Sequence, residues 1–424
     1  MRIAIAGGGI AGLGTAWLLH QRGYDVTLFE AASNAGGHTA TVDVTLDGRT
    51  FPVDTGFLVY NERTYPKLIA LLDELGVETV ASDMSFSCRV DAAGMEWAGT
   101  DLASLFAQPR NALRPSFWRM LADIVRFNRE ATAIAGGRGH ASLSLGEFLA
   151  QRGYSAPFRD WYLLPMAAAI WSSPKRDILH FPLASFVAFC HNHGLLQLAD
   201  RPQWRTVRGG ARTYVERIVA TLPDVRLATP VVRVDRRADH VEVVTHRHPV
   251  ERFDAIVLAC HSDQAHAILA DRSASEERLL SAVRYQPNRV VLHGDPALLP
   301  RSRRAWSAWN YLAADDPGGT RPVAVSYLIN KLQPLPCARP VIVTLNPPFE
   351  PDPRLVLGEY EYSHPVIDGE AVKSQRALAA MQGARRTYFA GAWMGYGFHE
   401  DGLASAHAVA DAIAAGIRTE KVAA

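Results

Sequence analysis

The hydrophobic pattern at the start of the chain alternates between strand and helix. Residues 3–6 form a short apolar run, and apolar side chains then recur at helical spacing across residues 13–19 until Gly23. A second apolar run, residues 25–29, follows directly. Short apolar runs are typical of buried strands, and a period of 3.6 residues is typical of a helix. The pattern therefore predicts a β-α-β unit and an α/β fold.

The rest of the chain divides into helical and strand-rich stretches. Residues 64–75 are predicted to form an amphipathic helix, and the pattern stays mostly helical from there to about residue 203. Further strands are expected at residues 230–234, 255–259, 323–329 and 341–345, and a final helix at residues 403–415. At 424 residues the chain is long enough for roughly two to three domain-sized units.

A glycine-rich turn, Gly7-Gly8-Gly9-Ile10-Ala11-Gly12, separates the first strand from the first helix. In a G-x-G-x-x-G turn the first glycine permits the tight turn, the second lets the backbone approach a pyrophosphate, and the third allows close helix–strand packing. Glu30 follows the second strand, where a carboxylate accepts the ribose hydroxyls of an adenosine and repels a 2′-phosphate. We therefore expect a dinucleotide other than NADP to contact Gly7, Gly9, Ile10, Ala11, Gly12, Glu30 and Ala31.

A second glycine pair follows this acidic residue closely. The segment Gly36-Gly37-His38-Thr39 leads into a strand-like run that ends at Thr55-Gly56-Phe57. A longer, extended dinucleotide needs backbone contacts beyond the first turn, so the second pair favours FAD over NAD. The cofactor-binding candidates in this region are Gly36, Gly37, His38, Thr39, Thr55, Gly56 and Phe57.

Glycines also mark residues 391–402 near the C-terminus. With both glycine-marked ends, the chain resembles the two-dinucleotide-binding-domain flavoproteins, the superfamily of amine oxidases, phytoene desaturases and protoporphyrinogen oxidase. Motifs at residues 53–57, 82–86, 306–310, 344–348 and 395–403 resemble, more specifically, a bacterial family of NAD/FAD-binding proteins. The same module precedes the methyltransferase in plant cyclopropane fatty acid synthases. The resemblance runs from residue 1 to about residue 415. Two positions depart from the wider superfamily, because His38 stands where arginine is usual and Ala392 stands where glutamate is usual.

This resemblance implies a Rossmann-like FAD-binding domain with an inserted mixed α+β substrate domain. The FAD-binding domain is expected in three pieces, residues 1–75, 204–261 and 366–424. The substrate domain is expected in a helical part, residues 76–203, and a strand-rich part, residues 262–365. Further cofactor contacts are expected at Val231, Val232, Ala259, Gly391, Ala392, Asp401, Gly402 and Leu403. No cysteine lies between residues 393 and 402, so we expect FAD to be bound noncovalently.

In that superfamily the N-terminus of the last helix points at the flavin pyrimidine. Free N–H groups of Gly402 and Leu403 would stabilise the negative charge of reduced flavin. Asp401 is expected either to cap this helix or to contact the cofactor. The candidate catalytic residues are Trp171, Lys331, Tyr396 and His399. By resemblance to amine oxidases Lys331 would hold a water at flavin N5. The ordinary alternatives are that this lysine faces solvent and that the aromatic side chains pack in the core.

Composition narrows the class of partner. The chain has 44 basic and 43 acidic residues and a net charge of +1, which argues against a nucleic-acid partner. The four cysteines form no C-x-x-C pair, and no secretory leader precedes the first strand, so a cytoplasmic protein is expected. No metal site is expected, because residues 190–193 lack a second pair of ligands at useful spacing. The longest apolar stretch, residues 161–171, is too short to span a bilayer.

The family resemblance, and not residue chemistry, suggests a lipid substrate. We expect an FAD-dependent oxidoreductase that oxidises or desaturates a methylated or unsaturated fatty acyl chain by hydride transfer to flavin N5. A cyclopropane-synthase-like methyltransferase is an expected partner. Two alternatives stay open, a flavin amine oxidase and a noncatalytic FAD-containing partner of an acyl-chain methyltransferase. Residues 109–129 carry five arginines among aromatic side chains, so peripheral contact with the inner membrane is a further expectation, with a solvated helix face as its alternative.

Overall fold

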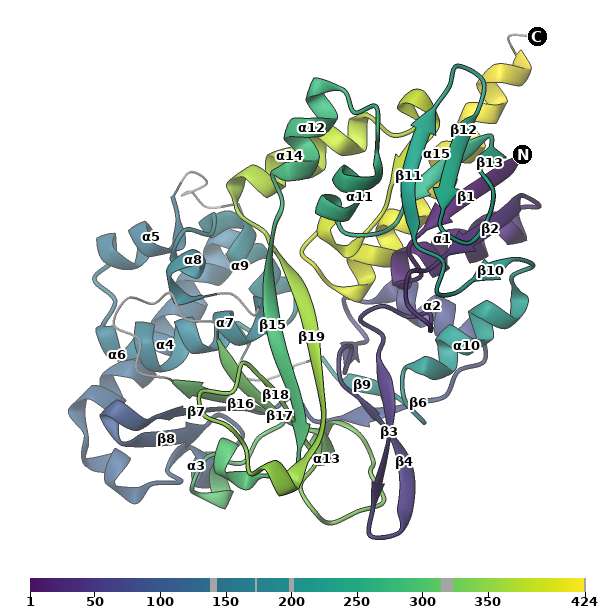
Figure 1. Ribbon diagram of the computed structural model, residues 1–424. Coiled ribbons are helices and arrows are strands. Elements are labelled where there is room, and N and C mark those ends of the chain that lie inside the picture. The colour runs from purple at the N-terminus through teal and green to yellow at the C-terminus, as the bar shows by residue number, and fades with distance from the viewer. Residues whose placement is uncertain (138–142, 172–173, 198–201, 314–322, 423–424) are drawn as a thin grey trace.

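The computed structural model describes residues 1–137, 143–171, 174–197, 202–313 and 323–422. One domain is built on a five-stranded sheet in the order β10-β2-β1-β14-β20, with every neighbouring pair parallel. The strands are β1 (Arg2–Ala6), β2 (Asp25–Phe29), β10 (Val225–Arg226), β14 (Ala255–Leu258) and β20 (Thr387–Phe389). Segments from the beginning, middle and end of the chain thus share one sheet, as the colours in Figure 1 show.

Strand β1 shows how the two faces of this sheet are covered. Ile3 and Ile5 belong to one hydrophobic cluster, and Ala4 and Ala6 belong to another, because successive side chains of a strand point to opposite faces. The first cluster includes α1 (Ile10–Gln21), α2 (Pro66–Glu74), α10 (Arg212–Thr221) and α15 (His399–Val422). The second includes β11 (Val231–Arg236), β12 (Val241–Thr245), β13 (Glu251–Phe253), α11 (Ser262–Ile268), α12 (Ala274–Ser281) and α14 (Gly369–Ala380). Both faces of the parallel sheet are therefore buried, as parallel sheets require.

The other domain is built on a mixed seven-stranded sheet in the order β19-β15-β18-β17-β16-β7-β8. Its strands are β7 (Phe86–Val90), β8 (Met95–Ala98), β15 (Arg284–His293), β16 (Trp309–Ala313), β17 (Ala324–Leu328), β18 (Ile342–Leu345) and β19 (Val356–Val366). The helices are α3 (Leu102–Leu105), α4 (Pro115–Ala135), α5 (Leu145–Gln151), α6 (Ala156–Phe158), α7 (Leu164–Trp171), α8 (Lys175–Leu179) and α9 (Leu183–Asn192). One large hydrophobic cluster joins this sheet to α4 through α9. The long strands β15 and β19 run side by side toward the first domain (Figure 1).

Shorter elements complete the fold. They are β3 (Thr41–Leu46), β4 (Arg49–Asp54), β5 (Tyr60–Asn61), β6 (Thr79–Ser82), β9 (Trp204–Val207) and α13 (Ile329–Leu332). Strands β3 and β4 pair as a hairpin, and β5 and β6 both pair with β9. Within the described ranges, no helix combines the length and the apolar character needed to cross a bilayer.

Most elements predicted from the hydrophobic pattern are confirmed. The predicted helix at 64–75 is α2, and the four later strand predictions correspond to β11, β14, β17 and β18. The final helix begins at His399, earlier than expected. The prediction of a mostly helical segment after residue 75 is wrong at its start, where β6, β7 and β8 occur. Strands β7 and β8 are buried along nearly their whole length, so they lack the alternation of polar and apolar residues that identifies a half-buried strand.

Candidate functional site

A cavity of about 1010 Å³ is lined by both domains. One wall is formed at the carboxyl ends of β1, β2 and β14, and the other comes from β16, β17, β19, α7 and α9. Ligands of open α/β sheets bind outside the carboxyl ends of the strands. The volume reaches the upper end of the roughly 300–1,000 Å³ range typical of ligand pockets. The cavity is therefore large enough to be considered as a joint site for a dinucleotide and a substrate.

The glycine turn after β1 forms a cradle at one wall of this cavity. Gly7 has a φ of +112°, and a Cβ atom there would lie 2.7 Å from the carbonyl oxygen of Ala259. A Cβ atom on Gly12 would lie 1.8 Å from the carbonyl oxygen of Gly7, so this glycine is required for the turn to pack on the helix. A Cβ atom on Gly9 would meet nothing within 4 Å. The backbone is thus open toward the cavity at Gly9, as a closely approaching pyrophosphate requires.

Glu30 lies at the end of β2 and lines the cavity. Its two carboxylate oxygens accept hydrogen bonds from the N–H groups of Gly8, at 2.6 Å, and Ala32, at 2.7 Å. Each oxygen keeps a further lone pair for a ligand. The carboxylate therefore both holds the glycine turn and remains able to accept ribose hydroxyls.

The second glycine pair packs directly on the first turn. The N–H of Gly36 donates to the carbonyl of Gly8 at 2.8 Å, and a Cβ on Gly37 would approach the Cα of Gly9 to 3.2 Å. The N–H of Phe57 donates to the carbonyl of His38 at 2.8 Å, which brings the end of the following hairpin to the same wall. Gly36, Gly37, His38, Thr55, Gly56 and Phe57 all line the cavity. The cradle is therefore continuous from Glu30 to Phe57, and it fits an extended dinucleotide such as FAD.

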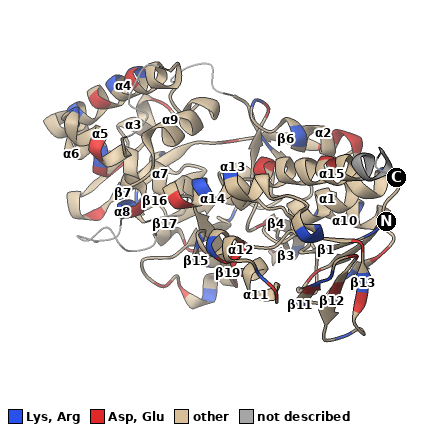
Figure 2. Cartoon of the chain, turned by 90° about the horizontal axis from the view of Figure 1, so that it is seen from above, with Lys and Arg blue, Asp and Glu red and all other residues tan. Residues whose placement is uncertain are grey.

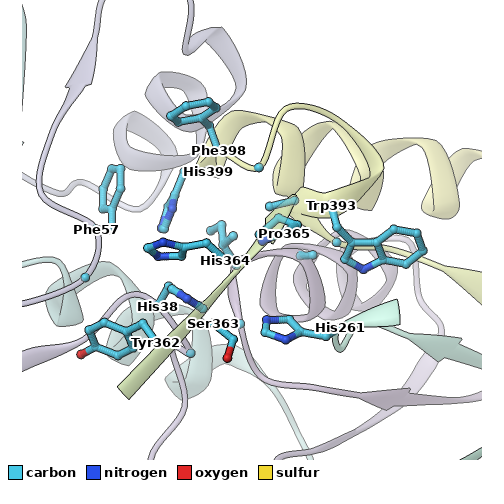
Figure 3. A pocket seen from close by; sticks show the side chains of 18 of the residues that line it. His38, Phe57, His261, Tyr362, Ser363, His364, Pro365, Trp393, Phe398 and His399 are labelled. Carbon is cyan, nitrogen blue, oxygen red and sulfur yellow. The ribbon is translucent and has the colours of Figure 1, made fainter. Parts of the chain in front are cut away.

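Imidazole rings surround the middle of the cavity (Figure 3). The ring of His38 lies 5.3 Å from those of His364 and Tyr362 and 6.0 Å from that of His261. Burial, assisted by the neighbouring imidazoles, lowers the pKa of His38 to about 4 and the pKa of His364 to about 3, so both rings are neutral near pH 7. The Nε2 atom of His38 is buried and has no hydrogen-bond partner among the described residues. A neutral ring with a free nitrogen therefore faces the cavity where the wider superfamily has arginine.

His399 lines the cavity at the start of α15, but its ring is already engaged. Its Nε2 lies 2.9 Å from both the Thr39 and the Tyr214 hydroxyl oxygens, and its ring stacks on Phe57 with a centroid distance of 3.6 Å. Burial lowers the pKa of His399 to about 3. The ring is neutral and held on both sides, so its role is to fix this part of the cavity wall. Thr39 does not line the cavity and acts on the site through its hydrogen bond to His399.

The residues after His399 hold the loop and helices in place. The Asp401 carboxylate accepts the N–H of Phe398 at 2.9 Å, and burial raises the pKa of Asp401 to about 6. The Glu400 carboxylate accepts the N–H groups of Lys67 and Leu68, at 2.9 and 3.0 Å, and so caps α2. Asp401 is the third residue of α15 and not its N-cap, so the capping role expected for it is wrong in position; its carboxylate instead reaches back to the residue that precedes the helix.

The expectation of free N–H groups at Gly402 and Leu403 needs correction. Helix α15 begins at His399, and the N–H of Gly402 already donates to the carbonyl of Phe398 at 3.1 Å. A Cβ on Gly402 would lie 2.8 Å from the Ile10 side chain, and Leu403 is 2% exposed in the core between α1 and α15. The free N–H groups of this helix belong to its first turn, residues 399–401.

Some other predicted residues also lie outside the cavity wall, and the reasons are structural. Val231 lines the cavity and Val232 does not, and the pairing of β11 with β12 is irregular at this point, between Val231 and Arg233. Lys331 is not a lining residue, and its ammonium group lies 3.2 Å from the Asp83 carboxylate, with more than a third of its side chain exposed. Its expected position beside the flavin is therefore not found. The predicted residues outside the wall are Gly12, Thr39, Val232, Lys331, Asp401, Gly402 and Leu403.

Away from the glycine turns, the cavity becomes an aromatic chamber. Trp171 lines it and packs on Phe189, with ring centroids 4.6 Å apart. On the facing sheet, Trp309 meets Tyr327 edge to face at 4.8 Å, and the Trp309 indole N–H is buried with no hydrogen-bond partner in the described part of the chain. The chamber, as the name is used below, consists of Met84, Ile170, Trp171, Phe189, Leu195, Trp309, Tyr327, Leu345, Tyr396 and Phe398.

Acidic side chains are confined to other parts of the cavity. Among the described lining residues they are Glu30, Asp263 and Glu361. Glu30 follows β2, Asp263 lies on α11 and Glu361 is an exposed residue of β19. The described residues also contain no group of three or more metal-ligating side chains. The chamber therefore offers aromatic and aliphatic surface with a few neutral polar groups.

Several lining residues were not predicted. They come from α9, from the loop before α11 and from β19, and they include Phe189, Cys260, His261, Tyr362 and His364. None of them stands in a recognisable motif. A histidine or an aromatic residue on a buried face is equally compatible with core packing, so no local signal could have identified them. The predicted residues that do line the cavity include Ala31, Ala259, Gly391, Ala392 and Tyr396.

Comparison with known proteins also indicates a flavin-binding protein. Residues 10–293 match the family described as flavin containing amine oxidoreductase. A carotenoid phi-ring synthase of Streptomyces griseus is 35% identical over 140 residues, which cover 30% of this chain and 25% of that protein. Bovine (Bos taurus) amine oxidase [flavin-containing] B is 25% identical over 280 residues, or 61% of this chain and 49% of that protein. The chain thus matches between a quarter and a half of the length of these relatives.

Among solved structures, a fatty acid isomerase of P. acnes that produces CLA has the same fold. It superimposes with a TM-score of 0.66 at 18% sequence identity, over 97% of this chain and 98% of that chain. At this identity the similarity concerns the fold alone. Together with the family match, it supports a Rossmann-like FAD-binding domain with an inserted mixed substrate domain.

Proposed function

This chain belongs to the family of flavin-containing amine oxidoreductases, and we propose that it oxidises or desaturates a methylated or unsaturated fatty acyl chain. Membership of the family makes it an FAD-dependent oxidoreductase. The nature of the substrate is the proposed part. The observation that carries it is the aromatic chamber, which has no acidic side chain among its described residues.

The chamber offers no carboxylate to pair with an ammonium group, and its apolar surface suits an acyl chain. Burying an ammonium group without a compensating charge is costly, whereas apolar surface gains free energy of about 25 cal/mol per Å² on leaving water. Trp171 and Phe189 on one side and Trp309 and Tyr327 on the other provide such surface. A fatty acid isomerase shares this fold, so the fold is compatible with an acyl substrate.

The residues of the chain have three tasks in this reaction. The glycine turns and Glu30 would hold FAD, which supplies a hydride acceptor when bound. The chamber would exclude water and align the acyl chain, as hydride transfer requires positioning more than a strong base. The free N–H groups in the first turn of α15 would stabilise negative charge on the reduced cofactor. Desaturation removes one hydrogen as a hydride, which the bound cofactor would accept, and one as a proton, which would pass to solvent.

Anaerobic reduction of the bound flavin tests the proposal. A phospholipid or free fatty acid with a methylated or unsaturated acyl chain, dispersed in detergent, should bleach the oxidised flavin band. Primary amines and polyamines should not. Ile170→Trp should slow the bleaching, because Ile170 lines the chamber, and should leave FAD affinity unchanged because α7 carries none of the glycine turns that would hold the cofactor.

A flavin amine oxidase is the second candidate, and the similarity to bovine amine oxidase B favours it. If amines reduce the flavin and acyl chains do not, this candidate replaces the first. If neither class reduces it and the protein binds an acyl-chain methyltransferase tightly, a noncatalytic FAD-containing partner is the better description. Each outcome therefore selects one of the three functions.

A further inference from the structure

An exposed apolar patch lies on the substrate domain outside the cavity wall. Leu102 is 75% exposed, Leu113 is 86% exposed and Trp118 is 52% exposed. None of them lines the cavity. Single exposed apolar side chains are common on protein surfaces, but a contiguous group of them marks an interaction surface.

Contacts in the structure show that these side chains form one patch. The ring of Phe106 lies 5.8 Å from that of Trp118. The Trp118 indole N–H donates to the carbonyl of Ala112 at 2.8 Å, which places the indole beside Leu113. The N–H of Phe106 donates to the carbonyl of Leu102 at 3.1 Å, so these two residues share one helical turn. We call Leu102, Phe106, Leu113 and Trp118 the apolar patch.

Helix α4 extends the patch along its solvent face. Trp118, Ala122, Val125 and Arg129 follow one another at spacings of three or four residues and therefore share one side of the helix. Val125 is 58% exposed. The opposite side is buried and carries residues such as Phe117, Met120 and Phe127. An ordinary surface helix has polar residues on its solvent side, so a solvated helix face does not account for the apolar residues here.

The charges around the patch are mainly positive. Arg110, Arg114 and Arg119 lie around the patch together with two acidic residues, Asp101 and Asp123, and the Arg119 guanidinium lies 3.5 Å from the buried Asp123 carboxylate. Arg110 and Arg119 are exposed. Two more exposed arginines lie in the short turn Arg303–Ala305 (η5), which packs on α3. Figure 2 shows that α3 and α4 lie on the side of the molecule away from both termini.

We propose that the apolar patch and these arginines dock the protein on an anionic lipid bilayer. Apolar side chains insert at the level of the headgroups, and the arginines pair with lipid phosphates. Helix α4 packs on α9, and Phe189 of α9 lines the cavity. A docked bilayer would therefore lie against the helical layer that encloses the cavity. The inference rests on the proposed function only in that the bilayer would supply the acyl substrate.

Vesicle cosedimentation of the FAD-loaded protein tests the docking. The protein should pellet with vesicles that contain phosphatidylglycerol, less with pure phosphatidylcholine, and less at high salt. Leu113→Ser with Trp118→Ser should weaken the binding roughly tenfold or more, because two large apolar side chains no longer leave water. Phe349→Ser is the matched control, since Phe349 is 42% exposed and lies outside the patch. It should bind as the unmodified protein does.

The outcomes separate docking from catalysis. An unchanged flavin spectrum and melting temperature would show that the double variant is folded, and its flavin should be reduced normally by a detergent-dispersed acyl substrate. Failure of the unmodified protein to bind anionic vesicles, or equal binding by the double variant, would overturn the proposal. A dimer that the double variant converts to monomer, with no vesicle binding, would show that the patch meets a second copy instead. Vesicle binding without flavin reduction by acyl chains would leave docking standing and overturn the proposed function.

Discussion

Replacing Glu30 with alanine tests the adenosine end of the cavity. The carboxylate accepts the N–H groups of Gly8 and Ala32 and keeps lone pairs for a ribose. A hydrogen bond to a charged group contributes about 1.5–3 kcal/mol. Losing the ribose contact should therefore weaken FAD binding roughly ten- to hundred-fold. Titration of the apoprotein with FAD, followed by quenching of flavin fluorescence, measures the dissociation constant.

FMN is a matched control ligand, because it has the flavin ring, the ribityl chain and one phosphate but no adenosine. If Glu30 acts through the ribose, the variant should lose affinity for FAD and keep its affinity for FMN. Glu30→Gln should lie between the two proteins, since it retains one acceptor oxygen of similar reach. The melting temperature of the apoprotein reports separately on the lost bonds to Gly8 and Ala32.

Two results would refute this reasoning. Unchanged FAD affinity would show that the carboxylate does not contact the ribose. An equal loss of affinity for FAD and FMN would show that Glu30 acts through the glycine turn, by way of the Gly8 N–H, and not through the adenosine.

Four further substitutions test other parts of the structure. Gly12→Ala should destabilise the protein by about 3 kcal/mol or more in thermal unfolding, since the added Cβ would collide with the turn. Gly9→Ala should fold normally, because the added Cβ meets no protein atom. It should bind FAD weakly, because that Cβ would occupy the space where the pyrophosphate approaches the backbone. Arg236→Met should cost about 3–5 kcal/mol by leaving the buried Glu276 carboxylate unpaired. Burial opposes ionisation, but Arg236 lowers the pKa of Glu276 to about 2, so this contribution to stability is lost as pH falls from 4.5 toward 2, and the difference in stability between the unmodified protein and the variant should narrow over that range. Lys331→Met should leave flavin reduction unchanged in rapid mixing, since Lys331 is outside the cavity wall; a large decrease in rate would contradict its placement.

The cofactor turn shows how much of the site could be predicted from sequence. Gly7 and Gly12 meet within one strand–helix turn, so their spacing alone specifies the contact. Helices such as α2 could be predicted because their apolar residues recur with the period of the helix. The chamber is different, because Trp171 and Trp309 line it while Trp97 is buried in the core and Trp118 is on the surface. Composition and local pattern do not distinguish these four positions.

The sequence by itself determined the class of fold, the family and the kind of cofactor, since these depend on contacts between residues that are close along the chain. Only the tertiary structure decided which side chains meet in the cavity. His38, His261 and His364 come together because α11 and β19 pack against the glycine-marked wall. Lys331 is held by Asp83 and kept out of the cavity by the same packing of distant segments. Such contacts depend on how two domains are joined, and no local pattern of residues encodes that arrangement.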